Sequence, residues 1–365
     1  HLLKADHDYL KPKDVALFGF GRVGRLVARE IIAQSAKGQQ LRLRAIITRS
    51  NSDTDIVKRA ELLRVDSVHG YFPGTVIEDL KNKSIIVNGH IIKMIASEEP
   101  GDLDLEAYGI KDALLIDNTG IARNRDTLGK HLNSKGVNKV LLTAPGKDDI
   151  PNIVHGVNHE NFDPDKETLF SAASCTTNAI VPVLYVVENT LGIKNGHIET
   201  IHSYTNDQNL LDNYHKKYRR GRSAALNMVI TETGAAGAVA KAIPGLKGKL
   251  TANAVRVPTP NVSLAILMLT VNKNTSVEEV NEIIKDAALN GELVEQIQYS
   301  YSNELVSSDI IGNSCAAVFD SPATIVGPGK RDIILYVWYD NEYGYSCQVV
   351  RLAKYITKVV RLKYY

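Results

Sequence analysis

The stretch DVALFGFGRVGRLVAREIIAQ, residues 14–34, decides how the first half of this sequence folds. An apolar run turns on Gly19, Gly21 and Gly24, and apolar residues then recur every three or four positions. This pattern predicts a strand, a tight turn and a helix. Glycines in such a turn let the backbone approach a pyrophosphate at the helix N-terminus. GFGRVG therefore predicts a dinucleotide-binding turn, with a plain glycine-rich turn as the alternative.

Outward from this turn, short apolar runs alternate with helix-like segments. We expect strands at 41–50, 84–89, 113–120 and 139–146, and a helix at 123–136. The alternation predicts an α/β fold of the Rossmann type, with a doubly wound and mainly parallel sheet. The longer apolar runs of the second half predict an α+β domain with a large mixed or antiparallel sheet. Its strands are expected at 197–207, 250–271 and 331–340, and its helices at 276–289 and 343–362.

Composition and charge narrow the class of protein. Hydrophobic residues make up 44% of the 365 residues and charged residues 23%, as in ordinary globular proteins. A formal net charge of +2 argues against nucleic acid as the primary partner. No apolar run is long enough to span a bilayer, so no membrane partner is expected. The cysteines, Cys175, Cys315 and Cys347, form neither a disulfide framework nor a metal-binding pattern. They favour a reducing compartment, and we expect the cytoplasm.

The end of the second expected strand bears on the choice of cofactor. NAD-binding folds of this type place an acid about 20 residues after the glycine turn, where it binds the ribose 2′-OH. Here the strand ends at Thr48 and Arg49, and no acid occurs before Asp53. An arginine at this place suits a 2′-phosphate, because a guanidinium pairs with phosphate oxygens. The sequence therefore favours NADP, with NAD as the alternative cofactor.

One cysteine has the setting of a nucleophile. In SAASCTTNAIVP, residues 171–182, Ser174 is a suitable N-cap and Cys175 falls in the first turn of the expected helix. The N–H groups and the helix dipole there are expected to lower the thiol pKa and favour thiolate. Free cysteines are also often buried and inert, so local chemistry leaves both interpretations open. Pro182 is expected to kink or break the helix.

Several ordered motifs extend this picture. They are SCTTN (174–178), IHSYTNDQ (201–208), TGAAGAVAKAIPGLKGKL (233–250), RVPTPNVS (256–263) and WYDNEYGYS (338–346). With GFGRVGR, they closely resemble the phosphorylating glyceraldehyde-3-phosphate dehydrogenases of bacteria, from the glycine turn to the C-terminal helix. The resemblance implies a dinucleotide-binding domain over 14–174, completed by a C-terminal helix at 342–365, and a catalytic domain over 175–341. Residues 1–13 resemble the remnant of an N-terminal extension found in longer members.

The resemblance also implies an activity and the residues that perform it. Cys175 would attack the aldehyde of glyceraldehyde 3-phosphate, and His202 would act as the base. Hydride transfer to the nicotinamide would leave a thioester, which inorganic phosphate would cleave to 1,3-bisphosphoglycerate. The two phosphates would be bound by Ser174, Thr176, Thr205, Asp207, Arg220, Thr233, Gly234 and Arg256. The cofactor would contact Gly19, Gly21, Arg22, Val23, Gly24, Thr48, Arg49, Thr119, Gly120, Thr143, Asn341 and Tyr345.

Further expectations concern the loop at 203–228. Because a carboxylate does not itself bind phosphate, we expect Asp207 to orient Arg256 or a hydroxyl. Members of the family are homotetramers, and this loop is the segment expected to pack across subunits. It carries Asn213 and Tyr214 where NAD-selective bacterial members have a Leu-Pro pair, which again favours NADP.

Two alternatives compete with this interpretation. Erythrose-4-phosphate dehydrogenase is the nearest enzyme, but its relatives usually break the HSYTND and TGAA motifs, which are intact here. A non-catalytic binding protein on the same fold is the other, and the intact Cys175 and His202 argue against it. The sequence departs from many members at Ala172, where they have Asn, and at Ala179, where they have a second Cys. We expect the change at Ala179 to leave the chemistry intact.

Overall fold

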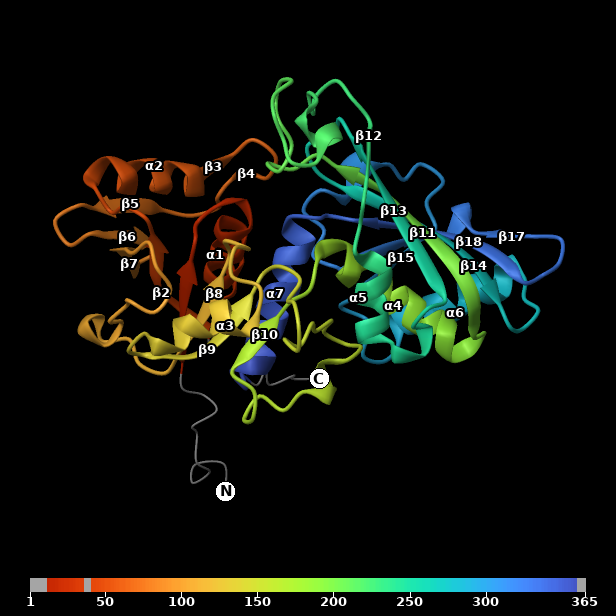
Figure 1. Cartoon of the computed structure of the whole chain (residues 1–365), viewed down its shortest axis with the longest axis horizontal. Helices are drawn as coiled ribbons and strands as arrows, with labels where there is room; N and C mark the ends of the chain where they lie inside the picture. Colours follow the sequence, from red (N-terminus) through yellow and green to blue (C-terminus); the bar gives the residue numbers. More distant parts are fainter. Residues whose placement is uncertain (1–11, 36–40, 360–365) are drawn as a thin grey trace. The chain divides into compact units, whose positions relative to one another are not determined.

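The computed structural model describes residues 12–35 and 41–359, which form two compact units. Of these residues, unit 1 contains those up to 153, those at 160–173 and those from 349 onward, and unit 2 contains 154–159 and 174–348. Figure 1 labels their strands and helices. Most of the expected N-terminal remnant, residues 1–11, lies outside the described residues, as does the end of the expected C-terminal helix beyond residue 359.

Unit 1 is built on one eight-stranded sheet. Its strands are β1 (Lys13–Phe18), β2 (Leu41–Thr48), β5 (Val76–Asp79), β6 (Ser84–Val87), β7 (His90–Ala96), β8 (Ala113–Asp117), β9 (Val137–Leu142) and β10 (Leu169–Ser171). They lie in the order β10-β9-β8-β1-β2-β7-β6-β5, and every neighbouring pair from β10 to β7 is parallel. The helices are α1 (Arg22–Ser35), α2 (Asp53–Arg64) and α3 (Arg125–Gly129), and a small sheet pairs β3 (Val65–Asp66) with β4 (Gly70–Tyr71). The predicted Rossmann-type, mainly parallel sheet is confirmed.

One edge of this sheet departs from the expected alternation of strands and helices. β6 is antiparallel to both β5 and β7. Only Asn88 and Gly89 separate β6 from β7, and both have positive φ, 48° and 83°. Positive φ at both positions is what a type I′ hairpin turn requires, and Asn-Gly is its preferred sequence. A two-residue link cannot make the crossover that parallel strands need.

Unit 2 is built on a second sheet. Its strands are β11 (Ile193–Ser203), β12 (Val229–Thr231), β13 (Leu250–Val257), β14 (Ser263–Val271), β15 (Ile297–Ser300), β16 (Ala317–Asp320), β17 (Ile325–Val326) and β18 (Asp332–Tyr339). The order is β12-β13-β11-β14-β18-β16-β15, with β17 beside β18. β11 runs parallel to β13 and antiparallel to β14, so the predicted mixed sheet is confirmed. The single strand expected at 250–271 is two strands, because the Pro-containing segment 258–262 interrupts it.

Four α-helices begin in the described residues of unit 2. They are α4 (Cys175–Thr190), α5 (Ala235–Ala242), α6 (Val277–Leu289) and α7 (Tyr343–Ile356), the last of which ends in unit 1. α4 continues through Pro182, so the break expected there does not occur. Its residues from Thr176 to Val187 are almost all buried, and packing outweighs the one helical hydrogen bond that proline cannot donate. Within the described residues, no helix is long and apolar enough to cross a membrane.

Candidate active site

Cys175 is the first residue of α4, as the sequence predicted. The Ser174 hydroxyl caps the helix by accepting the Thr177 N–H at 3.1 Å, and the Asn178 amide donates to the Ser174 carbonyl at 2.9 Å. This cap holds the first turn in place, with Cys175 half-buried at its start. Cys175 is therefore fixed in position, as a nucleophile must be.

His202 faces this thiol from the end of β11. Its Nε2 lies 3.6 Å from Cys175 Sγ, and its Nδ1 lies 2.7 Å from the main-chain oxygen of Ser203. Arg256 Nη1 lies 2.9 Å from both the Ser203 oxygen and His202 Nδ1. A carbonyl only accepts and a guanidinium only donates, so Nδ1 has one contact that suits each tautomer of the ring. In the tautomer that donates from Nδ1 to Ser203, Nε2 is unprotonated and faces the thiol, where it can accept the thiol proton.

The two reacting groups are electrically neutral in this environment. Burial, reinforced by the charge of Arg256, lowers the pKa of His202 to about 3. Burial raises the pKa of the Cys175 thiol, although Arg256 and the Thr176 N–H act in the opposite direction. The expectation that the helix N-terminus would lower this pKa is therefore wrong in its net direction, because burial outweighs the helix. A thiol beside a neutral imidazole needs proton transfer before it can attack.

Two arginines make the surroundings of His202 positive. Both Arg256 and Arg220 lower the pKa of His202 through their charge. Arg256 Nε is buried and has no hydrogen-bond partner among the described groups, so this donor is available for an anion. Arg220 donates through Nε to the Thr231 hydroxyl at 3.0 Å and through Nη1 to Asp207. Paired arginines of this kind suit a phosphate group.

Asp207 differs from its expected role. It pairs with Arg220 rather than with Arg256 or a hydroxyl, and His215 Nε2 lies 3.8 Å from its Oδ1. Arg220 follows Asp207 by thirteen residues within one loop, so the ion pair closes that loop on itself. Asp207 therefore orients an arginine, as we expected of a carboxylate near a phosphate site, but a different arginine.

The remaining predicted phosphate ligands are only partly assembled. The Thr176 hydroxyl lies 2.9 Å from the hydroxyl of Tyr339. Thr233 and Gly234 precede α5, and the Thr233 hydroxyl accepts the Ala235 N–H at 3.3 Å. Within the described part of the chain, Thr205, Thr233 and Gly234 form no hydrogen bond with Cys175, His202 or the two arginines.

Tyr339 is a site residue that sequence reasoning missed. Its hydroxyl bridges Thr176, at 2.9 Å, and Thr200, at 2.8 Å, and its ring meets the His202 ring edge-on at 6.1 Å. Burial and the nearby Cys175 raise the pKa of Tyr339, so the phenol keeps its proton. The hydroxyl can therefore organise the first turn of α4 without adding charge. Its place in the WYDNEYGYS motif was the available signal.

Asn341 is held by two serines that the sequence also did not single out. The hydroxyls of Ser203 and Ser263 both donate to Asn341 Oδ1, each at 2.9 Å. The amide oxygen is thus occupied, which leaves the NH₂ group as the donor that Asn341 can offer to a carboxamide. Tyr345 is buried in α7, and its N–H donates to the Asp340 carbonyl at 3.2 Å.

In unit 1, the glycine turn has the geometry of a phosphate cradle. Gly19 has a φ of 87°, and a Cβ at Gly24 would lie 2.6 Å from the Gly19 carbonyl oxygen, so both positions require glycine. A Cβ at Gly21 would meet open space just before α1. A pyrophosphate would fit there at the helix N-terminus, so these residues suit a dinucleotide. Val23 lies in the first turn of α1.

Arg22, which follows the turn, is held by an acid. Both of its terminal nitrogens pair with the two oxygens of Asp66 at 3.1 Å, and Arg25 lies 3.6 Å from the same carboxylate. Burial raises the pKa of Asp66, but the N–H groups of His69 and Val68 and the guanidinium of Arg22 lower it well below its usual range. Arg22 is therefore kept in one orientation beside the turn.

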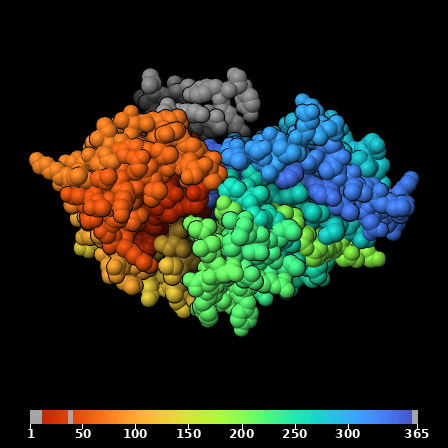
Figure 2. Space-filling view, turned by 90° about the horizontal axis from the view of Figure 1, so that it is seen from above, coloured from red at the N-terminus to blue at the C-terminus, as the bar shows by residue number. Residues whose placement is uncertain are grey.

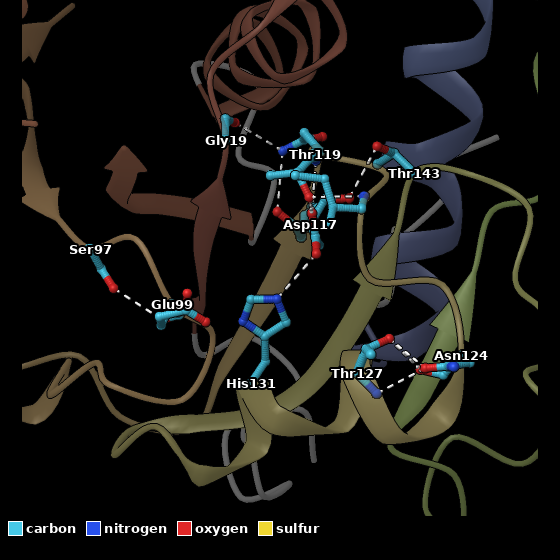
Figure 3. A network of polar contacts seen from close by, with 12 residues as sticks. Gly19, Ser97, Glu99, Asp117, Thr119, Asn124, Thr127, His131 and Thr143 are labelled. Carbon is cyan, nitrogen blue, oxygen red and sulfur yellow. Dashed lines mark hydrogen bonds and ion pairs between the residues drawn. The ribbon is translucent and has the colours of Figure 1, made fainter. Parts of the chain in front are cut away.

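The predicted contacts at Thr119, Gly120 and Thr143 come together in unit 1. Thr119 and Gly120 lie two and three residues after the end of β8, and Thr143 directly follows β9, its parallel neighbour. Figure 3 shows Thr119 and Thr143 on either side of Asp117, the last residue of β8. Ligands of open α/β sheets bind outside the carboxyl ends of the strands, where these residues lie.

The end of β2 offers a cation and no acid. Thr48 is buried, and its hydroxyl donates to the Ser50 carbonyl at 2.7 Å. Arg49 is exposed and forms no hydrogen bond or ion pair with another described residue. Asp53, the nearest acid along the chain, lies on α2 and pairs with Lys83 at 2.7 Å.

Comparison with known proteins identifies both halves of the chain. Residues 13–125 match the family model described as glyceraldehyde 3-phosphate dehydrogenase, NAD binding domain, and residues 174–341 match its C-terminal domain. The chain is 56% identical over 351 residues to a glyceraldehyde-3-phosphate dehydrogenase-like protein of Pseudomonas aeruginosa, covering 96% of this chain and 76% of that protein. It is 43% identical over 343 residues to glyceraldehyde-3-phosphate dehydrogenase 1 of Bacillus cereus, covering 94% and 98%. The chain is 42% identical over 342 residues to the glyceraldehyde-3-phosphate dehydrogenase of Priestia megaterium, covering 94% and 97%.

The geometry predicts how Cys175 reacts with an alkylating agent. In the ligand-free protein, the rate of alkylation by iodoacetamide should keep rising past the pKa of an ordinary thiol, about 8.5, because burial raises the pKa of Cys175. Mass spectrometry of the Cys175 peptide over a range of pH measures the rate, with Cys315→Ser as the control. Arg256→Gln should move the profile to still higher pH. A rate that levels off below about pH 7 would show that the helix N-terminus outweighs burial.

Proposed function

Because the chain belongs to the glyceraldehyde-3-phosphate dehydrogenase family, we propose that it converts D-glyceraldehyde 3-phosphate to 1,3-bisphosphoglycerate, with NADP as the favoured cofactor and inorganic phosphate as co-substrate. The observation that carries the proposal is the 3.6 Å contact between Cys175 Sγ and Nε2 of the neutral His202 ring, beside two arginines. The reaction belongs to glycolysis or gluconeogenesis in the cytoplasm. Residues 14–174 with the C-terminal helix form the dinucleotide-binding domain, and 175–341 form the catalytic domain, a division supported by the family matches.

The first step joins the substrate to the enzyme. His202 Nε2 accepts the Cys175 proton as Sγ attacks the aldehyde carbon, and the carbonyl oxygen takes up a proton to give a hemithioacetal. The substrate phosphate is bound by Arg256 and Arg220, whose donors include the unpartnered Arg256 Nε. Binding at both ends of a three-carbon substrate fixes the aldehyde carbon next to the thiol.

The second step oxidises the hemithioacetal. The bound nicotinamide supplies the hydride acceptor, and Asn341 directs its NH₂ group to the carboxamide. His202 Nε2 takes the hydroxyl proton as the hydride leaves carbon, which produces a thioester on Cys175. The Ser203 carbonyl holds the Nδ1–H throughout, so the ring returns the proton from the same nitrogen that received it.

The third step releases the product. An oxygen of inorganic phosphate attacks the thioester carbonyl, the carbon–sulfur bond breaks, and 1,3-bisphosphoglycerate leaves as the thiol is restored. Thr176 lies in the first turn of α4, next to the thioester, and the N–H groups of this turn suit the attacking phosphate. Thr233 and Gly234, before α5, supply a second helix N-terminus for it.

Substrate charge also activates the base. A pKa of about 3 makes His202 a weak base in the ligand-free protein, and the charges of Arg256 and Arg220 are part of the cause. A phosphate dianion bound to these arginines neutralises that charge and raises the pKa of His202 toward the range useful for general-base catalysis. The proton transfer is thereby coupled to the presence of a phosphorylated substrate.

Activity assays test this function. Reduction of NADP or NAD should require both D-glyceraldehyde 3-phosphate and inorganic phosphate, because only phosphate releases the acyl group. Cys175→Ser should lower kcat by about a thousandfold or more, and His202→Asn by about a hundredfold or more. Cys315→Ser serves as the control and should keep wild-type activity.

Three results would contradict the proposal in separable ways. Absence of cofactor reduction with any substrate would remove the enzyme assignment, and turnover without phosphate would remove the phosphorylation step. A higher kcat/KM for erythrose 4-phosphate would assign a different sugar phosphate to the same chemistry.

NADP is favoured because of the residues at the end of β2. Arg49 is exposed and without a partner among the described residues, so its guanidinium is available to a 2′-phosphate. Asp53, which could have bound a ribose 2′-OH, is engaged by Lys83. A carboxylate at the position of Arg49 would repel the 2′-phosphate, whereas a guanidinium pairs with it.

Reversal of the charge at Arg49 tests the preference for NADP over NAD. Wild-type protein should show a higher kcat/KM with NADP than with NAD, and Arg49→Asp should lower the value for NADP by about ten- to a hundredfold, the loss of a charge-assisted hydrogen bond. Arg331→Asp, at an exposed arginine of unit 2, makes the same change in net charge and should leave the preference unaltered. A strong preference of the wild type for NAD would overturn this part of the proposal.

The enzyme is proposed to act as a homotetramer. Several large apolar side chains of the loop after β11 are exposed, and the surface of this loop is drawn in green in Figure 2. They are Leu210, Leu211, Tyr214, Tyr218, Leu226 and Met228. Monomeric proteins rarely gather so much apolar surface in one segment, which supports contact between subunits there.

Light scattering after size-exclusion chromatography tests the assembly. Wild-type protein should have the mass of four chains, and Leu226→Asp combined with Met228→Asp should shift it to smaller species, because two charges would be buried in an apolar contact. Ile77→Asp, at an exposed apolar residue of β5, is the control and should not change the mass. A wild-type monomer would contradict the proposal.

A further inference from the structure

A buried carboxylate stands at the centre of the cofactor-binding turns of unit 1. Asp117, the last residue of β8, is 1% exposed. Its Oδ1 accepts both the N–H and the hydroxyl of Thr119, each at 2.7 Å, and its Oδ2 lies 3.1 Å from His131 Nε2 (Figure 3). Burial of a carboxylate is costly unless donors satisfy it. Here three donors do so.

The main chain of the same residue holds the neighbouring turn. The Asp117 carbonyl accepts the N–H of Thr143 at 3.0 Å and its hydroxyl at 3.1 Å. The side chain of Asp117 thus fixes the turn after β8, and its main chain fixes the turn after β9. The two turns that carry Thr119, Gly120 and Thr143 therefore both depend on this one residue.

The glycine turn is joined to the same assembly. The amide of Asn118 donates to the Gly19 carbonyl at 3.4 Å and to the Ile116 carbonyl at 3.2 Å. A Cβ at Gly19 would lie 2.9 Å from Thr119 Cγ2, so the two turns touch. A shift of the turn after β8 would therefore displace the glycine turn as well.

His131 is placed so that it can act only on Asp117. It is fully buried, its ring meets Phe18 edge-on at 4.7 Å, and its Nδ1 has no hydrogen-bond partner among the described groups. A carboxylate only accepts, so His131 Nε2 carries the proton that it donates to Asp117. The single polar anchor of this ring is the carboxylate that holds Thr119. A histidine with no solvent contact and no other polar partner is suited to positioning.

We propose that Asp117 and His131 are positioning residues that hold three cofactor-contacting turns in the binding conformation and thereby set the affinity for the nicotinamide dinucleotide. The inference rests on the proposed cofactor use, but it concerns binding and not the chemistry on Cys175. Neither Asp117 nor His131 needs to contact the cofactor directly for this positioning role. Turns held in place before binding lose less conformational entropy when the cofactor arrives.

Direct cofactor binding tests this assignment apart from catalysis. Fluorescence titration of the purified protein with NADPH and NADH gives Kd, thermal unfolding gives Tm, and steady-state rates at saturating cofactor give kcat. Asp117→Ala should raise Kd by about tenfold or more, the factor expected from a lost hydrogen bond to a charged group. Asp117→Asn should raise it less, because the amide oxygen still accepts from Thr119. His131→Phe should raise Kd by leaving Asp117 Oδ2 unpaired. In all three, kcat at saturation should change by less than about threefold, since that step lies on Cys175.

Matched variants separate positioning from general loss of stability. Asp320→Asn removes another buried carboxylate, which accepts the Trp338 Nε1–H at 2.9 Å in unit 2, and should leave Kd unchanged whatever its effect on Tm. Thr119→Ser keeps the hydroxyl that reaches Asp117, whereas Thr119→Val removes it at an exposed position and should alone raise Kd. If the Asp117 variants do not fold, His131→Phe, which changes no residue expected to contact the cofactor, keeps the test decisive.

Two outcomes would overturn the inference. One is an unchanged Kd in folded Asp117→Ala together with an unchanged Kd in Thr119→Val. The other is an equal rise in Kd for Asp320→Asn. Wild-type protein that binds the dinucleotide but does not oxidise D-glyceraldehyde 3-phosphate would contradict the proposed function and leave this inference standing.

Discussion

The hydrogen bond from His202 Nδ1 to the Ser203 carbonyl is the interaction on which the candidate active site depends. When Nδ1 donates this bond, the nitrogen facing Cys175 is an acceptor, and the pKa of His202, about 3, keeps the ring neutral. The same oxygen accepts from Arg256, whose Nη1 also lies 2.9 Å from Nδ1, so the cation is held beside the imidazole. One main-chain carbonyl therefore contacts both the ring and the cation whose charge helps to lower the pKa of that ring.

The register of the second sheet produces this arrangement. Parallel pairing of β11 with β13 places Arg256 directly opposite His202, and antiparallel pairing of β14 with β18 places Tyr339 opposite Ser263. Successive side chains on a strand point to opposite faces, so a slip of one residue would turn His202 away from Cys175. The buried core of unit 2 fixes the register, because the same slip would expose its apolar residues. Core packing far from Cys175 thus determines that His202 faces the thiol.

The sequence predicts those parts of the molecule that local rules control. The glycine turn and the Ser174 cap follow from steric and hydrogen-bonding rules within a few residues, and both are confirmed. The expected direction of the shift in the Cys175 pKa was wrong, because burial of the thiol depends on elements distant in the sequence. The partner of Asp207 was also wrong, because the path of the loop that brings Arg220 to it follows no short-range rule. No short-range pattern in the sequence marks Ser263 as a site residue, because its hydrogen bonds form only once β14 lies beside β11.

In both units, a buried acid at the end of a strand fixes the turn that follows. Asp117 is the last residue of β8, and Asp340 directly follows β18; both are buried. Asp117 accepts from Thr119, and Asp340 accepts the N–H groups of Glu342, Tyr343 and Gly312 at 2.8 to 2.9 Å. At the end of a strand, the hydrogen bonds of the sheet no longer satisfy every main-chain N–H group. A carboxylate that accepts hydrogen bonds from several of these N–H groups fixes the turn that follows. Thr119 and Asn341, the residues expected to contact the cofactor, lie within two positions of these acids. A turn that is already held in place loses less conformational entropy when a ligand binds to it.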